Sequence, residues 1–160
     1  MKKNIYYWSP SLNPVGTIKS TLNSAIALSK FNKNYKINII NVCGEWDGYE
    51  NVFKANSVNL INLSFSYIRF LPKNGFLKSR LSYVIIIFLS FFPLLKLLKK
   101  NGPDILVIHL LTSLPMFLLY IFKFRAKIIL RISGNPKLNV VRKFFWSLIS
   151  RKIFRVTCPS

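Results

Sequence analysis

A short apolar run closed by a histidine is the feature that most restricts how this chain can fold. Residues Ile105–Ile108 follow the turn signal Asn101-Gly102-Pro103 and are rich in β-branched side chains. Four residues are too few for a helix, and an unbroken apolar run is typical of a strand buried on both faces of a parallel sheet. His109, the only histidine of the chain, comes directly after this strand.

The position of His109 makes it a candidate site residue, because ligands of open α/β sheets bind outside the carboxyl ends of the strands. An imidazole titrates near neutral pH and could orient or activate a substrate. On this interpretation we expect His109 to face a cleft and to contribute little to packing. A histidine buried for structural reasons is the alternative that the sequence leaves open.

Strands alternate with helices along the whole chain. The predicted strands cover residues 4–8, 36–43, 58–63, 105–108 and 127–132, with a last one from residue 154. Helical periodicity is found from residue 18 to about 26 and over 66–100, 114–124 and 138–152. This order predicts an α/β fold, a single Rossmann-like domain over residues 1–160 with a doubly wound parallel sheet of about six strands. The loops after the first, fourth and fifth strands should meet at one crevice.

The loop after the first strand carries Gly16, and the helix that follows offers free N–H groups that can bind an anion. Thr17 is predicted as the N-cap of this helix. The motifs G-x-G-x-x-G and G-K-[ST] are not found, so neither a dinucleotide site nor a P-loop is indicated. A simple turn residue is the alternative for Gly16. In the loop after the second strand, Glu45 and Asp47 are predicted to be solvated.

The charge of the chain is strongly positive, with 24 Lys and Arg against four acids and a net charge of +20. Such a surface fits a polyanionic partner or an anionic membrane, although an AT-rich genome would give a similar composition. The basic residues are scattered and match no recognition motif, so nucleic acid is not the expected partner. Cys43 and Cys158 form no metal-binding motif, so we expect no metal cofactor.

The most apolar segment, residues 83–95, is too short to span a membrane, and Pro93 and Lys96 interrupt it. Basic residues flank it on both sides. A core helix and a helix lying in the membrane interface are both consistent with this pattern. A membrane-spanning hairpin of residues 83–98 and 110–122 is disfavoured because Asp104, His109 and the turn lie between them.

Four motifs occur in a characteristic order, and no single one is highly specific. They are Ser9-Pro10 with Gly16-Thr17, then Pro103-Asp104-Ile-Leu-Val-Ile-His109, then Arg131-Ile-Ser-Gly134-x-Pro136, and finally Val156-Thr-Cys-Pro-Ser160. In their order and spacing, which cover the whole chain, the sequence resembles the N-terminal half of a GT-B fold. The similarity is to the family-four group of retaining glycosyltransferases that build bacterial surface polysaccharides and lipopolysaccharide.

The resemblance implies a role for each matching residue. His109 would contact the donor sugar as the catalytic residue, and Gly16 with Thr17 would approach the reacting sugar and diphosphate. The other substrate-binding residues would be Arg131, Ser133 and Gly134. The implied partners are a glycan or lipid-linked acceptor, a nucleotide-sugar donor and the anionic membrane surface. The implied location is cytoplasmic and peripheral, on the inner face of the cytoplasmic membrane, and no metal is implied.

Enzymes of this family are much longer, and a C-terminal domain holds most of the donor nucleotide. The resemblance therefore implies that residues 1–160 are the acceptor-side domain, that the donor-binding domain is absent, and that this piece alone does not catalyse transfer. A glycosidase-type mechanism is disfavoured because no pair of carboxylates is available. The alternative function, from another class, is a non-catalytic basic module that binds a membrane surface.

Overall fold

The computed structural model describes residues 2–13, 16–73, 75–100, 102–132 and 140–158. Six strands form one sheet in the order β3-β2-β1-β4-β5-β6, and all neighbouring strands are parallel. The strands are β1 (Lys3–Trp8), β2 (Tyr35–Asn41), β3 (Asn59–Asn62), β4 (Ile105–Ile108), β5 (Lys127–Arg131) and β6 (Ile153–Thr157). The predicted α/β, doubly wound parallel sheet is therefore confirmed.

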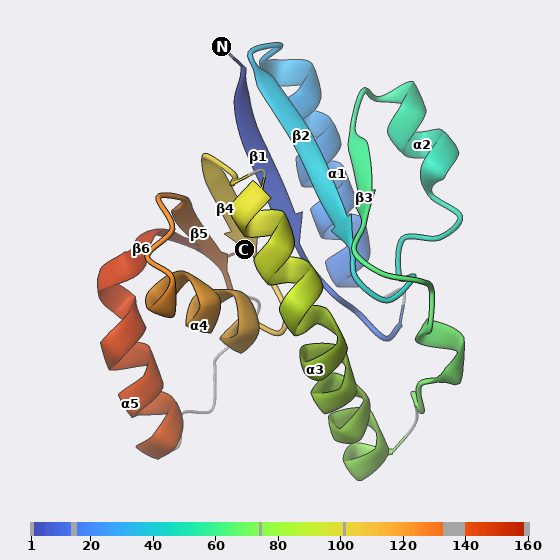
Figure 1. The fold of residues 1–160 in the computed structure, drawn as a ribbon. Coiled ribbons are helices and arrows are strands. Elements are labelled where there is room, and N and C mark those ends of the chain that lie inside the picture. Colours follow the sequence, from blue (N-terminus) through green and yellow to red (C-terminus); the bar gives the residue numbers. More distant parts are fainter. Residues whose placement is uncertain (1, 14–15, 74, 101, 133–139, 159–160) are drawn as a thin grey trace.

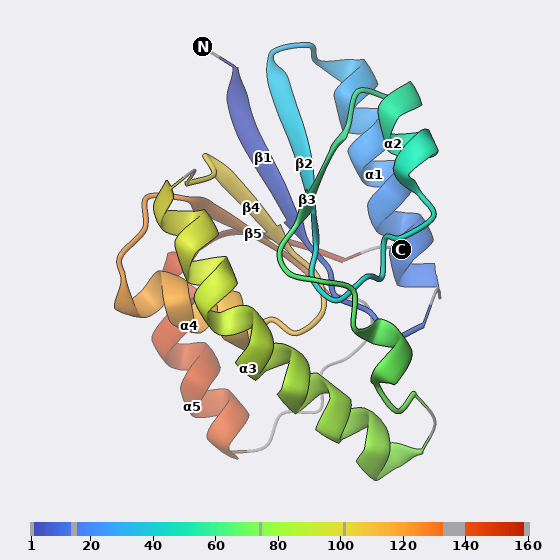
Figure 2. The same cartoon turned by 45° about the vertical axis from the view of Figure 1, so that its right-hand side comes forward.

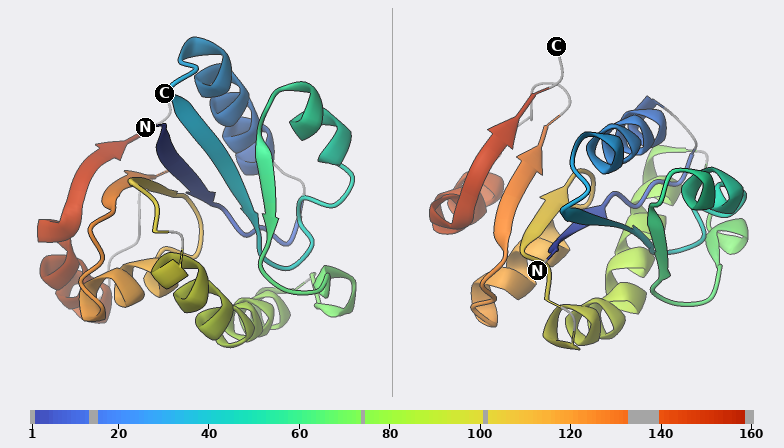
Figure 3. Two further views of the ribbon diagram at one scale, coloured as in Figure 1. Left: turned by 45° about the horizontal axis from the view of Figure 1, so that its top comes forward. Right: turned by 90° about the horizontal axis from the view of Figure 1, so that it is seen from above.

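Helices cover the sheet in two layers (Figure 1). The helices α1 (Gly16–Phe31) and α2 (Glu50–Ala55) lie on one face, and α3 (Phe76–Lys100), α4 (Ser113–Ile121) and α5 (Val140–Ile149) lie on the other (Figures 2 and 3). The chain changes face in the crossover from β3 through α3 to β4. This change of direction is what makes the fold doubly wound.

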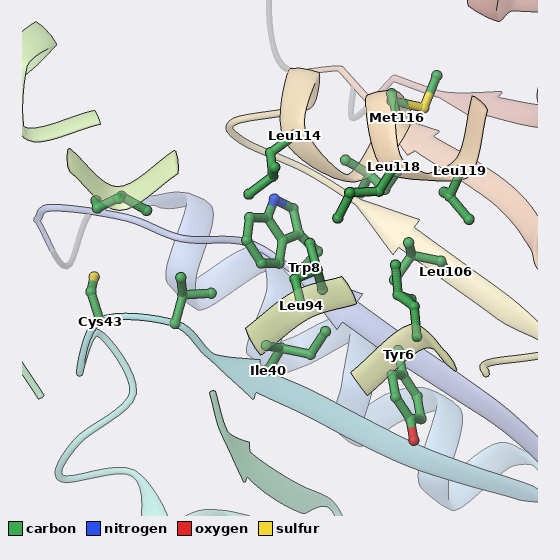
Figure 4. Close-up of a cluster of buried hydrophobic side chains, with 14 of the residues drawn as sticks. Tyr6, Trp8, Ile40, Cys43, Leu94, Leu106, Leu114, Met116, Leu118 and Leu119 are labelled. Carbon is green, nitrogen blue, oxygen red and sulfur yellow. The ribbon is translucent and has the colours of Figure 1, made fainter. Parts of the chain in front are cut away.

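The central strands are largely apolar because each face of the sheet has its own core. Trp8, Ile40 and Leu106 point toward α3 and α4, where they pack with Leu94 and Leu118 (Figure 4). The alternate residues of the same strands pack in a second cluster on the α1 side, which includes Ile5, Tyr7, Ile37, Ile39 and Val107. Burial on both faces explains the continuous apolar runs of the sequence.

The long apolar helix α3 begins at Phe76, ten residues later than the predicted start at residue 66. The preceding segment contains a short 3-10 turn, Ile68–Phe70, and then Pro72. Gly75 has a φ of +96°, a left-handed conformation that a helix cannot contain. The prediction was wrong here because apolarity was taken as helicity.

Among the described residues, α3 is the one helix whose length and composition would allow it to cross a membrane. One side of it is nevertheless buried in the domain. Five residues at four-residue spacing form this side, namely Ser82, Ile86, Ser90, Leu94 and Leu98. The helix therefore completes the core on its face of the sheet.

The short helix α2 was not predicted, because six residues give too little periodicity to be recognised. Phe53 of this helix is buried against Trp46, with their ring centroids 5.7 Å apart. Trp46 also contacts Tyr49 edge-on, at 5.8 Å. These three aromatic rings hold the loop after β2 onto the sheet.

Candidate functional site

His109 is fixed at the carboxyl end of β4 by the backbone. Its N–H donates to the carbonyl of Trp8 at 2.9 Å, which extends the β1–β4 ladder by one residue. The predicted location at a strand end is confirmed. The side chain, however, is buried, with 3% of its surface exposed, whereas we expected it to face a cleft. The difference arises because α1 packs directly over this end of the sheet.

A buried polar cluster surrounds the His109 ring. Thr21 Oγ1 of α1 lies 3.4 Å from His109 Nδ1 and 3.3 Å from Ser9 Oγ, in the loop after β1. When the Thr21 hydroxyl donates to Ser9, its oxygen accepts from the Nδ1–H of the imidazole. Two of the three loops predicted to meet, those after the first and fourth strands, are therefore brought together by α1. The loop after the fifth strand, residues 133–139, lies outside the described residues.

Arg131, the last residue of β5, reaches the same helix. Its guanidinium donates to Ser20 Oγ at 2.5 Å and to the Ser20 carbonyl at 3.4 Å. A third pair, Tyr7 and Ser24, shares a hydroxyl hydrogen bond of 3.1 Å. The inner side of α1 is therefore partly polar: beside the apolar Ile18 and Ala25 it carries three hydroxyl residues that contact β1, His109 and β5. Sequence periodicity showed only the apolar part of this side.

The electrostatics of the cluster keep His109 neutral. Burial, together with the smaller effect of the positive charge of Arg131, lowers the pKa of the imidazole to about 4. Near pH 7 the ring is therefore an uncharged hydrogen-bonding group and not a cation. A neutral imidazole can orient a hydroxyl group or accept its proton. It cannot form an ion pair with a phosphate.

Gly16 and Thr17 lie in the first turn of α1. Thr17 is not the N-cap, because the helix already includes Gly16. Gly16 has no left-handed φ, and among the described residues no atom lies within 4 Å of the place where its Cβ would be. The described residues therefore give no steric reason for a glycine here, and they leave Gly16 exposed. Ser133 and Gly134 lie outside the described residues.

The acids of the chain are elsewhere, and one of them was predicted wrongly. Glu45 is buried and not solvated: its carboxylate accepts from the N–H groups of Val42 and Cys43, at 2.8 to 3.1 Å. Burial raises its pKa. Gly44, with a φ of +104°, turns the chain so that Glu45 folds back onto β2. A glutamate directly after a turn glycine was the only signal of this arrangement.

Asp104 lies at the opposite, amino end of the sheet, where Oδ2 accepts from Asn4 N–H at 2.7 Å. Within the described part of the chain, no three His, Cys, Asp or Glu side chains gather as they would around a metal ion. The chemistry that the site can offer is therefore that of hydroxyl groups, a neutral imidazole, a guanidinium and the start of a helix.

A groove of about 580 Å³ adjoins the cluster on the α1 side of the sheet. Tyr7, Val107 and Ile129 line its floor, and Arg131 with Arg155 supplies positive charge. Arg131 thus belongs both to the buried cluster and to an open surface.

No family model and no curated protein matches this sequence. Solved structures do match the fold. UGT73P12 of Glycyrrhiza uralensis, solved with glycyrrhetinic acid 3-O-monoglucuronide, aligns with a TM-score of 0.58 at 11% identity. The alignment covers 84% of this chain and 28% of that one. CalG4, the calicheamicin glycosyltransferase, aligns with a TM-score of 0.56 at 13% identity, over 91% of this chain and 36% of CalG4.

The fold is thus a Rossmann-like domain of the kind found in GT-B glycosyltransferases. The chain spans about a third of the length of these structures. At such low identity the likeness concerns the fold, and residue roles must come from the site itself.

Proposed function

We propose that this chain is the acceptor-side, N-terminal domain of a glycosyltransferase, with its substrate site at the start of α1. The observation that carries the proposal is the tie between α1 and the carboxyl ends of three strands through His109, Arg131 and Tyr7. It places an open helix start, at Gly16, above the edge where α/β sheets bind ligands. The fold shared with solved glycosyltransferases supports the same reading.

The proposed division of labour follows from the chemistry of these groups. The N–H groups in the first turn of α1, at Gly16 and Thr17, would face the leaving diphosphate, where a helix start stabilises negative charge. His109, neutral near pH 7, would hold Thr21 of α1 through its Nδ1 and so position the start of the helix against the reacting sugar. Arg131 would hold α1 in place through Ser20 and add positive charge to the site.

The finer parts of the proposal rest on the sequence resemblance. They are a retaining reaction, a nucleotide-sugar donor held mainly by a separate domain, and a glycan or lipid-linked acceptor in polysaccharide or lipopolysaccharide synthesis. A cytoplasmic location on the membrane belongs to the same set. Each is an expectation about the enzyme of which this domain would be a part.

A non-catalytic membrane-binding module is the second candidate, and the burial of His109 favours it. A histidine that is closed off by α1 can serve stability alone. The two candidates differ in whether the start of α1 binds a sugar.

Chemical-shift titration of the labelled chain tests the proposal. We expect a panel of short oligosaccharides to shift the amide signals of Gly16 and Thr17, because these amides line the open helix start. Gly16→Val should weaken that binding by filling the open space, whereas Asn23→Val, on the exposed side of the same helix, should not. UDP-glucose should shift the same two amides, because the proposal has them face its diphosphate. Shifts that avoid α1 altogether, or a Gly16→Val variant that binds as the parent does, would contradict the proposal.

A further inference from the structure

The outer side of α3 is a second apolar surface, separate from the side that packs in the core. Its residues recur at spacings of three and four, which places them on one stripe of the helix. They are Leu77, Leu81, Val84, Phe88 and Phe92, and all are exposed. Phe88 and Phe92 each have 74% of their surface exposed. The stripe spans roughly 22 Å at the rise of an α-helix.

The neighbouring helices extend this surface. α4 packs beside α3 and α5 packs beside α4, all on the same face of the sheet (Figures 2 and 3). Both expose further large apolar side chains, namely Phe117, Tyr120, Ile121, Val140, Phe144 and Leu148. Exposed apolar surface spread over three adjacent helices is uncommon for a monomer in water and marks an interaction site.

Positive charge surrounds the apolar stripe. Lys78 and Arg80 lie at the first turns of α3, and Lys96, Lys99 and Lys100 lie at its end. None of the helices α3, α4 and α5 contains an acid. Lys96 and Lys100 also line a groove of about 480 Å³ between α3 and the edge strand β3. An occupant must therefore be apolar inside and negatively charged at its rim.

We infer that this face binds the surface of an anionic lipid bilayer, with α3 lying in the plane of the interface. The Phe88 and Phe92 side chains would insert among the acyl chains, and lipid phosphates would pair with the lysines at the ends of the helix. A second copy of this chain fits the surface less well, because two strongly basic rims would be brought together. Nucleic acid also fits less well, because it supplies the negative charge but no apolar interior to cover the exposed side chains.

A membrane-spanning α3 is incompatible with the fold. Its inner residues Ile86, Leu94 and Leu98 are fully buried in the core with Trp8 and Leu106. Removing the helix into a bilayer would uncover this core, whereas an in-plane helix keeps its inner side on the sheet and gives its outer side to lipid. The inference does not depend on sugar transfer, because it uses no residue of the His109 cluster.

Flotation of the purified chain with vesicles tests the inference. We expect strong binding to vesicles of phosphatidylcholine mixed with phosphatidylglycerol, weak binding to phosphatidylcholine alone, and loss of the difference in high salt. The pair Phe88→Ser and Phe92→Ser should reduce partitioning roughly 30-fold by removing two inserted rings. Phe31→Ser is the matched control, since Phe31 is 85% exposed but lies at the end of α1 on the opposite face.

The charge is tested separately. Lys96→Gln with Lys100→Gln should reduce binding to anionic vesicles roughly 20-fold and leave binding to neutral vesicles unchanged. Lys30→Gln with Lys54→Gln, on α1 and α2, should have little effect on either. Salt-independent binding that is equal on both lipids would overturn the inference, as would equal losses in the Phe31 and Phe88/Phe92 variants. A lipid-free dimer that the Phe88/Phe92 changes dissociate would also overturn it, because a second copy would then cover the surface.

Discussion

His109 Nδ1 lies 3.4 Å from Thr21 Oγ1, although 88 positions separate the two residues in the sequence. The contact closes α1 over the end of β4 and removes the imidazole from water. A group that titrates near neutral pH in the unfolded chain is thereby held neutral in the folded one. The relationship has consequences for stability that can be measured without knowing any substrate.

We expect the chain to lose stability between pH 6.5 and pH 4 through His109. The folded pKa is about 4 and the ordinary pKa of histidine is 6.5, so in this range the unfolded state binds a proton that the folded state does not. The loss should reach about 2–3 kcal/mol near pH 4, and stability from this source should be complete above pH 6.5. Urea unfolding at several pH values measures it.

His109→Gln isolates this effect, because other groups such as Glu45 also titrate in acid and remain in both proteins. The variant should be less stable at pH 7.5, and the difference between the two proteins should shrink as the pH falls. Parallel pH profiles for the parent and the variant would show that His109 titrates in the folded state as it does in the unfolded state.

Arg131→Gln should raise the pKa of His109, because the guanidinium is one of the two causes of the lowered value. Burial is the larger cause, so the rise should be at most about one unit. The chain has a single histidine, and its ring signals can be followed through a pH titration by NMR. Arg155→Gln, in the same groove but outside the cluster, is the control and should leave the titration unchanged.

Two residues on opposite sides of α3 should differ sharply in their effect on folding. Ile86 is fully buried, and Ile86→Ala should cost about 3 kcal/mol of unfolding free energy by leaving a cavity. Phe88 is exposed, and Phe88→Ala should cost less than about 0.5 kcal/mol. Urea denaturation of both variants decides this, and a larger loss for Phe88 than for Ile86 would mean that α3 is rotated from the orientation described.

Glu45→Gln should destabilise the loop after β2. An amide keeps one acceptor oxygen but turns an NH₂ group toward the N–H groups of Val42 and Cys43, which leaves a buried donor without an acceptor. We expect a loss of about 2 kcal/mol in chemical denaturation. Asp47→Asn is the matched change, because Asp47 is exposed and its Oδ1 would still accept from Asn41. Equal effects of the two changes would argue that the Glu45 carboxylate is not buried in solution.

Much of the fold could be read from local pattern. The apolar runs that became β1, β4 and β5 were recognisable because strands buried on both faces are mostly apolar, and their alternation with helices implied a parallel sheet. The start of α3 and the helix α2 were missed for local reasons as well. The positive φ of Gly75 prevents the apolar segment before it from joining α3. The six residues of α2 are too few to show a helical period.

The sequence by itself thus determined the order of strands and helices, the place of His109 at a strand end and the excess of positive charge. Only the tertiary structure decided that His109 is buried, that Arg131 binds Ser20, and that α3 turns one apolar side inward and another outward. The physical reason is that hydrophobic periodicity reports how apolar a position is and not which neighbour covers it. Burial and hydrogen-bond partners arise from contacts between residues far apart in the chain, such as Thr21 with His109 and Ser20 with Arg131.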